Sequence, residues 1–342
     1  QDTPLLTIQG LTAGYGNKDM HGMPAIRVLE DIDLTVRRGQ AIGVIGESGS
    51  GKSTLARVVA GLLTPALGGL TFDGQPLGGS LSERTDEQFR RIQMVFQNAD
   101  TALNPMHSVS TILSRPLKMY FGLKGAALRE RIGELLDLVR LPRTLAVRRP
   151  NELSGGQKQR VNLARALAAK PDLILCDEVT SALDTVVGAA ILELLRDLRQ
   201  ELGVSYLFIS HDISTVRALC DDIVVMYSGH KVQAGTRQSF AQAPFHPYTD
   251  LLIHSVPELR QGWLETCNTT CGTLPPIGAK ANVPELCTFL SRCPVRVDGL
   301  CNSTAPNRRT IDGGSEILCH HDSAELLKTQ LDLITMTQGA YA

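Results

Sequence analysis

The sequence of 342 residues lacks an excess of either charge, and it lacks a long apolar run. The 34 Lys and Arg residues nearly balance 35 Asp and Glu residues, which excludes a nucleic-acid binder driven by bulk positive charge but not a local basic patch. No apolar run approaches the roughly 18 residues that span a bilayer, and no secretory signal opens the chain. We therefore expect a chain that does not cross a membrane. It begins at Gln1 rather than Met, so we expect a trimmed or longer polypeptide.

Cysteine is scarce until the last part of the chain. Only Cys176 and Cys220 lie in the first 266 residues, and the other six of the 8 cysteines lie between residues 267 and 319. Pro, Thr, Asn and Gly cluster from Thr266 to Gly314. Apolar residues make up 43% of the chain, enough for a sizeable core. We predict one α/β domain over residues 1–238 and a loop-rich extension over 239–342 that packs separately.

Short apolar runs alternate with helical patterns along the first domain. The segment Pro4 to Val36 predicts antiparallel strands. Strands and helices alternate afterwards, which predicts a doubly wound parallel sheet. Its expected elements are strands at 40–46, 173–176 and 205–209 and helices at 53–63 and 188–202. The largely helix-forming stretch at about 100–167 predicts an inserted helical subdomain.

A phosphate-binding motif follows the strand at 40–46. Residues 46–53 read G-E-S-G-S-G-K-S and match G-x-x-x-x-G-K-[ST]. Its glycines let backbone N–H groups turn toward a β-phosphate at the N-terminus of the following helix. Lys52 would reach the β- and γ-phosphates, and the Ser53 hydroxyl would bind Mg²⁺. The motif predicts a nucleoside triphosphate site, shared by GTPases, kinases and ATPases.

Two further motifs narrow this class. Residues 153–157 read L-S-G-G-Q, and the strand that follows ends in Asp177 and Glu178. Together with the phosphate loop, this order resembles the ATP-binding cassette (ABC) ATPases over nearly the whole chain. The resemblance implies a P-loop fold with a RecA-like parallel sheet, an antiparallel β subdomain and an inserted helical subdomain.

The same resemblance implies a role for each motif residue. Asp177 would hold Mg²⁺ together with Ser53 and Gln97, and Glu178 would polarise the attacking water. His211 would contact the γ-phosphate, and Tyr15 would stack on adenine. The residues expected at ATP are Tyr15, Gly46, Ser48, Gly49, Ser50, Gly51, Lys52, Ser53, Thr54, Ser154, Gly155, Gly156, Gln157 and Asp184. The expected catalytic residues are Glu178, His211, Gln97 and Lys52.

One chain lacks part of such a site. In ABC ATPases the signature at 153–157 caps the γ-phosphate of ATP bound to the opposite subunit, with Ser154 and the backbone of Gly155 and Gly156 as donors. This chain has one phosphate loop and one signature. The resemblance therefore implies a second nucleotide-binding domain, identical or paralogous.

Finer features are similar to the importer group for peptides, nickel and opines. These are V-F-Q at 95–97 with L-N-P at 103–105, and H-P-Y-T at 246–249. Asn98 to Asp100 replace the group's usual Asp-Pro-aromatic, and Val179 replaces its usual Pro. The group implies two transmembrane permease subunits, a periplasmic or external substrate-binding protein and a peripheral place on the cytoplasmic face of the inner membrane, without nucleic acid. A soluble ABC ATPase of DNA repair or translation and an ABC exporter component are the alternatives.

The C-terminal cysteines suggest a bound metal group. Reducing cytosol disfavours disulfides, and four thiolates suit a [4Fe–4S] cluster or tetrahedral zinc. The importer group's extension holds an iron–sulfur cluster in some members, which implies Cys287, Cys293, Cys301 and Cys319 as ligands. Zinc and unliganded thiols stay open, and Cys267 and Cys271 lie outside this pattern.

Overall fold

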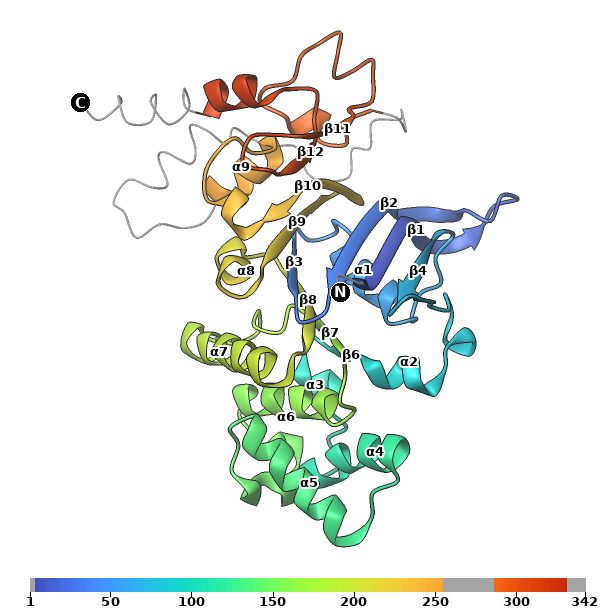
Figure 1. The fold of residues 1–342 in the computed structure, drawn as a ribbon, viewed down its shortest axis with the longest axis vertical. Coiled ribbons are helices and arrows are strands. Elements are labelled where there is room, and N and C mark those ends of the chain that lie inside the picture. Colours follow the sequence, from blue (N-terminus) through green and yellow to red (C-terminus); the bar gives the residue numbers. More distant parts are fainter. Residues whose placement is uncertain (1–3, 255–285, 331–342) are drawn as a thin grey trace, which may run out of the picture.

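The computed structural model describes residues 4–254 and 286–330. A four-stranded antiparallel sheet in the order β2-β1-β4-β5 opens the fold (Figure 1). Its strands are β1 (Pro4–Lys18), β2 (Pro24–Arg37), β4 (Leu67–Phe72) and β5 (Gln75–Pro76). The predicted antiparallel strands are thus confirmed.

The larger sheet has eight strands in the order β11-β12-β10-β9-β3-β8-β7-β6. Its strands are β3 (Ala41–Ile45), β6 (Ile92–Val95), β7 (Leu173–Asp177), β8 (Ser205–Ser210), β9 (Asp222–Tyr227), β10 (His230–Thr236), β11 (Arg308–Thr310) and β12 (Glu316–Leu318). From β9 to β6 all neighbours pair in parallel, which confirms the doubly wound core. Every residue of β3, β7 and β8 is buried, which explains their continuous apolar runs.

Helices cover this sheet and extend one end of the molecule (Figure 1). They are α1 (Lys52–Val59), α2 (Asp86–Arg91), α3 (Ala99–Ala102), α4 (Val109–Phe121), α5 (Gly125–Leu138), α6 (Gly155–Leu167), α7 (Thr185–Leu202), α8 (Ile213–Leu219) and α9 (Pro247–His254). Helices α3 to α6 lie in the stretch at about 100–167, whose status as an inserted subdomain stays a prediction. Helix α1 ends earlier than the expected Leu63, because Gly61 takes a positive φ of 80°. In the two described ranges, no helix is long and apolar enough to cross a membrane.

The C-terminal segment, described at residues 239–254 and 286–330, joins the core sheet. Strand β12 pairs antiparallel with β10 and also with β11, and Tyr248 and Phe289 belong to the same buried cluster as the core strands. The expectation of a separately packed extension is therefore wrong, because Tyr248 and Phe289 are buried together with the core strands of the cassette. The boundary at residue 238 stays a prediction, and Cys267 and Cys271 lie outside the described residues.

Candidate active site

The motif at 46–53 forms the turn between β3 and α1, and its glycines are required there. Gly46 has a φ of 152°, and Gly51 has a φ of 103°. A Cβ on Gly46 would lie 2.2 Å from the Met226 carbonyl oxygen, and one on Gly51 would lie 2.7 Å from Leu29 Cδ2. A side chain at Gly46 would therefore displace β9, and one at Gly51 would be strained by the positive φ.

Lys52 folds back over this loop. Its Nζ donates hydrogen bonds to the carbonyl oxygens of Gly46 and Glu47, over 2.7 and 2.9 Å. Burial lowers the pKa of Lys52, while the carboxylates of Glu178 and Asp177 act in the opposite direction. A buried ammonium group gains from a nearby anion, and a phosphate at this loop would supply one.

Ser53 and Asp177, two of the three residues expected at Mg²⁺, lie side by side. The Ser53 hydroxyl donates a hydrogen bond to Asp177 Oδ1 over 2.9 Å. Asp177 ends β7 and is buried, and this burial raises its pKa. Oxygen ligands of these two kinds suit Mg²⁺, which would stabilise the carboxylate, so the pair fits the ion that the motif implies.

Glu178 meets the other expected catalytic groups beside this pair. Gln97 Nε2 donates to Glu178 Oε2 over 2.9 Å and to Ser181 Oγ over 3.1 Å. His211 Nδ1 lies 3.7 Å from Glu178 Oε1. Gln97, Glu178 and His211 follow β6, β7 and β8, so the carboxyl ends of parallel strands bring them to one edge. Glu178 itself has a φ of 48°, a strained conformation of the kind found at functional sites.

Tyr15 lies beside the first turn of α1. Its hydroxyl is 3.3 Å from Thr54 Oγ1, and it accepts a hydrogen bond from Arg57 over 3.1 Å. The side chain is 37% exposed, which leaves part of the ring open to a ligand. Arg57 is not predictable from the sequence as a partner of Tyr15, because a helical arginine carries no motif of its own.

The signature residues lie elsewhere, at the start of α6. Ser154 is the N-cap of that helix, and its Oγ accepts a hydrogen bond from the Gln157 amide. A Cβ on Gly156 would lie 2.6 Å from Val187 Cγ1 of α7, while Asp184 caps α7. In the described part of the chain, no hydrogen bond or ion pair joins residues 154–157 to residues 46–53. The contacts described for Ser154, Gly156 and Asp184 are with α6 and α7.

Comparison with known proteins decides the family. Residues 29–181 match the family described as "ABC transporter", and residues 232–301 match "Oligopeptide/dipeptide transporter, C-terminal region". A putative peptide import ATP-binding protein of Brucella abortus is 39% identical over 306 residues, which cover 89% of this chain and 90% of that protein. The chain belongs to the ABC transporter ATPases. A Brucella ovis protein of the same description is 35% identical over 94% of this chain and 99% of its own length.

Solved structures of ABC proteins share the fold. The cbiO1 protein of Clostridium perfringens, part of the transporter complex cbiONQ, has a TM-score of 0.62 at 28% identity and covers 70% of this chain and 90% of its own. The cassette MJ0796, a dimer bound to ADP and Pi after hydrolysis, has a TM-score of 0.59 at 30% identity, over 68% of this chain and 98% of its own. As an ABC ATPase, this chain binds and hydrolyses ATP with Mg²⁺.

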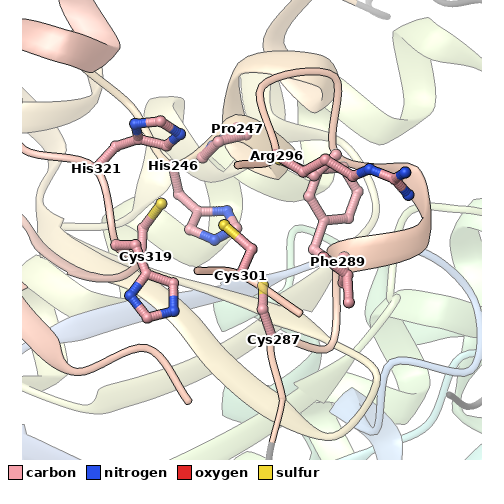
Figure 2. Close-up of a pocket in the computed structure, with 11 residues that line it drawn as sticks. His246, Pro247, Cys287, Phe289, Arg296, Cys301, Cys319 and His321 are labelled. Carbon is pink, nitrogen blue, oxygen red and sulfur yellow. The ribbon is translucent and has the colours of Figure 1, made fainter. Parts of the chain in front are cut away.

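The C-terminal segment of the ATPase brings its four described cysteines to one cavity (Figure 2). These are Cys287, Cys293, Cys301 and Cys319, and none of them forms a disulfide. Burial raises the pKa of Cys293 to about 12 and that of Cys319 to about 11, with neighbouring cysteines adding to both. Within residues 4–254 and 286–330, no three Cys, His, Asp or Glu side chains are arranged to hold a single metal ion.

Proposed function

We propose that this ATPase drives an importer that takes up peptides or a related small solute. The observation that carries the proposal is the match of residues 232–301 to the C-terminal region of oligopeptide and dipeptide transporters. The same chain also carries the expected ATPase residues Lys52, Glu178 and His211. Some relatives that match this chain along most of their own length are described as putative peptide import proteins, and they support the same cargo.

Hydrolysis at this site is a matter of charge and position, because negative charge spreads over the γ-phosphoryl oxygens in the transition state. Lys52 would neutralise part of that charge from inside the loop. Gln97 and His211 flank the Glu178 carboxylate, so it would orient a water molecule for attack. Ser53 and Asp177 would hold Mg²⁺, which supplies further positive charge at the phosphates.

The proposal includes the remaining subunits. Ser154, Gly155 and Gly156 would complete the ATP site of a second cassette, as the single signature in the chain requires. Tyr15 would stack on adenine in its own site, and Asp184 would lie between the two. Two permease subunits would receive the cassettes at the cytoplasmic face of the membrane, and an external binding protein would deliver the solute.

We also propose a [4Fe–4S] cluster at the cysteine cavity. Cys287 and Cys293 lie on either side of the short 3-10 helix Leu290–Arg292, Cys301 lies in a turn, and Cys319 follows β12. All four line the same cavity, which supports Cys₄ ligation. The C-terminal segment is rich in turns, so ligand binding would add folding free energy there.

The alternatives predict different partners. A soluble ATPase of DNA repair or translation would need a zinc module or a long coiled coil inserted in the ATPase core, or a second cassette with a basic linker. The sequence has no long heptad stretch and no basic block. An exporter component would not explain the match at 232–301.

Purification of the assembled complex from its own membrane tests the proposal. Two membrane subunits and a second cassette should copurify, and peptide-loaded binding protein should stimulate ATP hydrolysis in reconstituted vesicles. ATPase activity that responds to DNA or ribosomes instead, or transport of solute out of the cell, would overturn it.

A further inference from the structure

Glu47, the second residue of the phosphate loop, contacts the C-terminal segment through both its backbone and its side chain. Its amide donates a hydrogen bond to the Tyr248 hydroxyl over 2.8 Å. Its two carboxylate oxygens each accept a hydrogen bond from Arg292, over 3.0 Å in both cases. Such a two-pronged arginine–carboxylate pair fixes orientation as well as charge.

Arg292 is itself held firmly. Its side chain is 9% exposed, and its guanidinium lies 5.6 Å from the centre of the Tyr227 ring and donates to the Tyr227 hydroxyl over 3.3 Å. Burial alone would lower the pKa of Arg292, but the bonds to Glu47 and Tyr227 outweigh burial and raise it. The pair is therefore a shielded ion pair rather than a flexible surface contact.

The support behind these contacts is an aromatic cluster. The ring centroids of Tyr227 and Tyr248 are 4.6 Å apart, and those of Tyr227 and Phe289 are 5.1 Å apart. Tyr248 and Phe289 are fully or almost fully buried. Core strand β9, helix α9 and the segment around Arg292 thus meet at one place, directly behind the phosphate loop.

We infer that Arg292 and Tyr248 are positioning residues of the ATPase, which act through Glu47 to hold the phosphate loop ready for nucleotide. The carboxylate of Glu47 lies in a loop that must accept a highly negative ligand. Without Arg292 it would be an uncompensated charge near the phosphates, and the loop would lose its anchor. The Tyr248 hydroxyl accepts a hydrogen bond from the Glu47 amide and so fixes the direction in which the chain leaves β3. This inference rests on the proposed role of the loop and is independent of the cargo.

Nucleotide binding to the purified full chain tests the inference. Arg292→Ala should weaken the affinity for a fluorescent ATP analogue by about tenfold, the scale of one charge-assisted hydrogen bond. In the assembled transporter the KM for ATP should rise while kcat stays nearly unchanged, because Lys52 and Glu178 are intact. Arg292→Lys should recover part of the loss. Arg308→Ala is the matched control, since Arg308 lies in the same segment but pairs with Glu316, and it should bind like the wild type.

A double-mutant cycle separates positioning from general stability. If Arg292 acts through Glu47, Arg292→Ala should have little further effect on affinity in a Glu47→Gln background. Tyr248→Phe, which removes only the hydroxyl, should also weaken binding and covers the case in which Arg292→Ala does not fold. Wild-type affinity in folded Arg292→Ala and Tyr248→Phe, or effects of Arg292→Ala and Glu47→Gln that simply multiply, would overturn the inference. Failure of the wild type itself to bind the analogue would instead contradict the proposed ATP site.

Discussion

Gln97 donates a hydrogen bond to Glu178 across 2.9 Å, although the two residues are 81 positions apart. The contact joins the loop after β6 to the end of β7 and fixes one carboxylate oxygen of Glu178. His211 lies near the other oxygen, at 3.7 Å. The carboxylate is therefore held from two sides, which is the arrangement that a water-orienting group needs.

Replacement of this carboxylate should stop turnover but not binding. Glu178→Gln keeps the size of the side chain and leaves Lys52 and Ser53 in place. ATP should bind as in the wild type, and hydrolysis should fall by about two orders of magnitude or more, the scale for loss of a catalytic base. Steady-state phosphate release from an assembly with the variant in both cassettes would measure the effect.

The matched control is Glu193→Gln, an exposed position on α7 whose carboxylate pairs with Arg140. It should leave hydrolysis unchanged. Normal phosphate release by Glu178→Gln in the complete assembly would rule out the role assigned to this carboxylate.

The contact between Ser53 and Asp177 leads to a prediction about Mg²⁺. Ser53→Ala removes an oxygen that would bind the ion, so the Mg²⁺ concentration for half-maximal hydrolysis should rise by about tenfold or more, as for loss of groups that support a metal ligand. Titration of Mg²⁺ at constant ATP would measure it. In the presence of a chelator, the affinity of Ser53→Ala for nucleotide should equal that of the wild type. An equal loss of nucleotide affinity with and without Mg²⁺ would contradict the assignment.

Much of the catalytic edge could be predicted from the sequence, since each of its residues ends a buried strand or belongs to a local motif. Lys52 and Ser53 follow β3, and Glu178 follows β7. Motifs of this kind depend on local backbone geometry, which a short stretch of sequence determines. The parallel sheet then brings the motifs together. Strands β7 and β8 illustrate this, because their short, fully apolar or nearly apolar runs predict them, whereas β6 (Ile92–Val95) contains Gln93 and is not expected from the sequence.

The join between the C-terminal segment and the cassette could not be predicted in the same way. Strands β11 and β12 are each three residues long, too short for a periodic pattern. Arg292 and Glu47 are separated by 245 positions, and a single charged residue in a turn-rich segment gives no sign of its partner. The four residues at 246–249 indicate from the sequence only a likeness to importers of this group, whereas their burial in the core depends on the tertiary fold.

The proposed cluster has a direct chemical test. Protein purified without oxygen should be brown and contain about four iron and four sulfide per chain, as a Cys₄-ligated [4Fe–4S] cluster requires. Cys293→Ser should remove the colour, because this residue lines the shared cavity. Cys220→Ser is the control, since Cys220 is buried in the cassette and should leave the iron content unchanged. Zinc in place of iron, or neither metal, would exclude the cluster.

The shared core predicts that damage in the C-terminal segment destabilises the cassette as well. Phe289 is 1% exposed and packs against Tyr227 and Tyr248. Phe289→Ala should lower the free energy of unfolding by about 3 to 5 kcal/mol, because it removes a buried aromatic ring and leaves a cavity. Leu300→Ala, at a side chain that is 41% exposed in the same segment, should change it by less than about 0.5 kcal/mol.

Denaturant unfolding followed both by circular dichroism and by release of a bound ATP analogue would measure the effect. With one common core, both signals of Phe289→Ala should shift together to lower denaturant. A new early transition that leaves nucleotide release at its wild-type midpoint would show instead that the segment unfolds independently, and it would contradict the shared core.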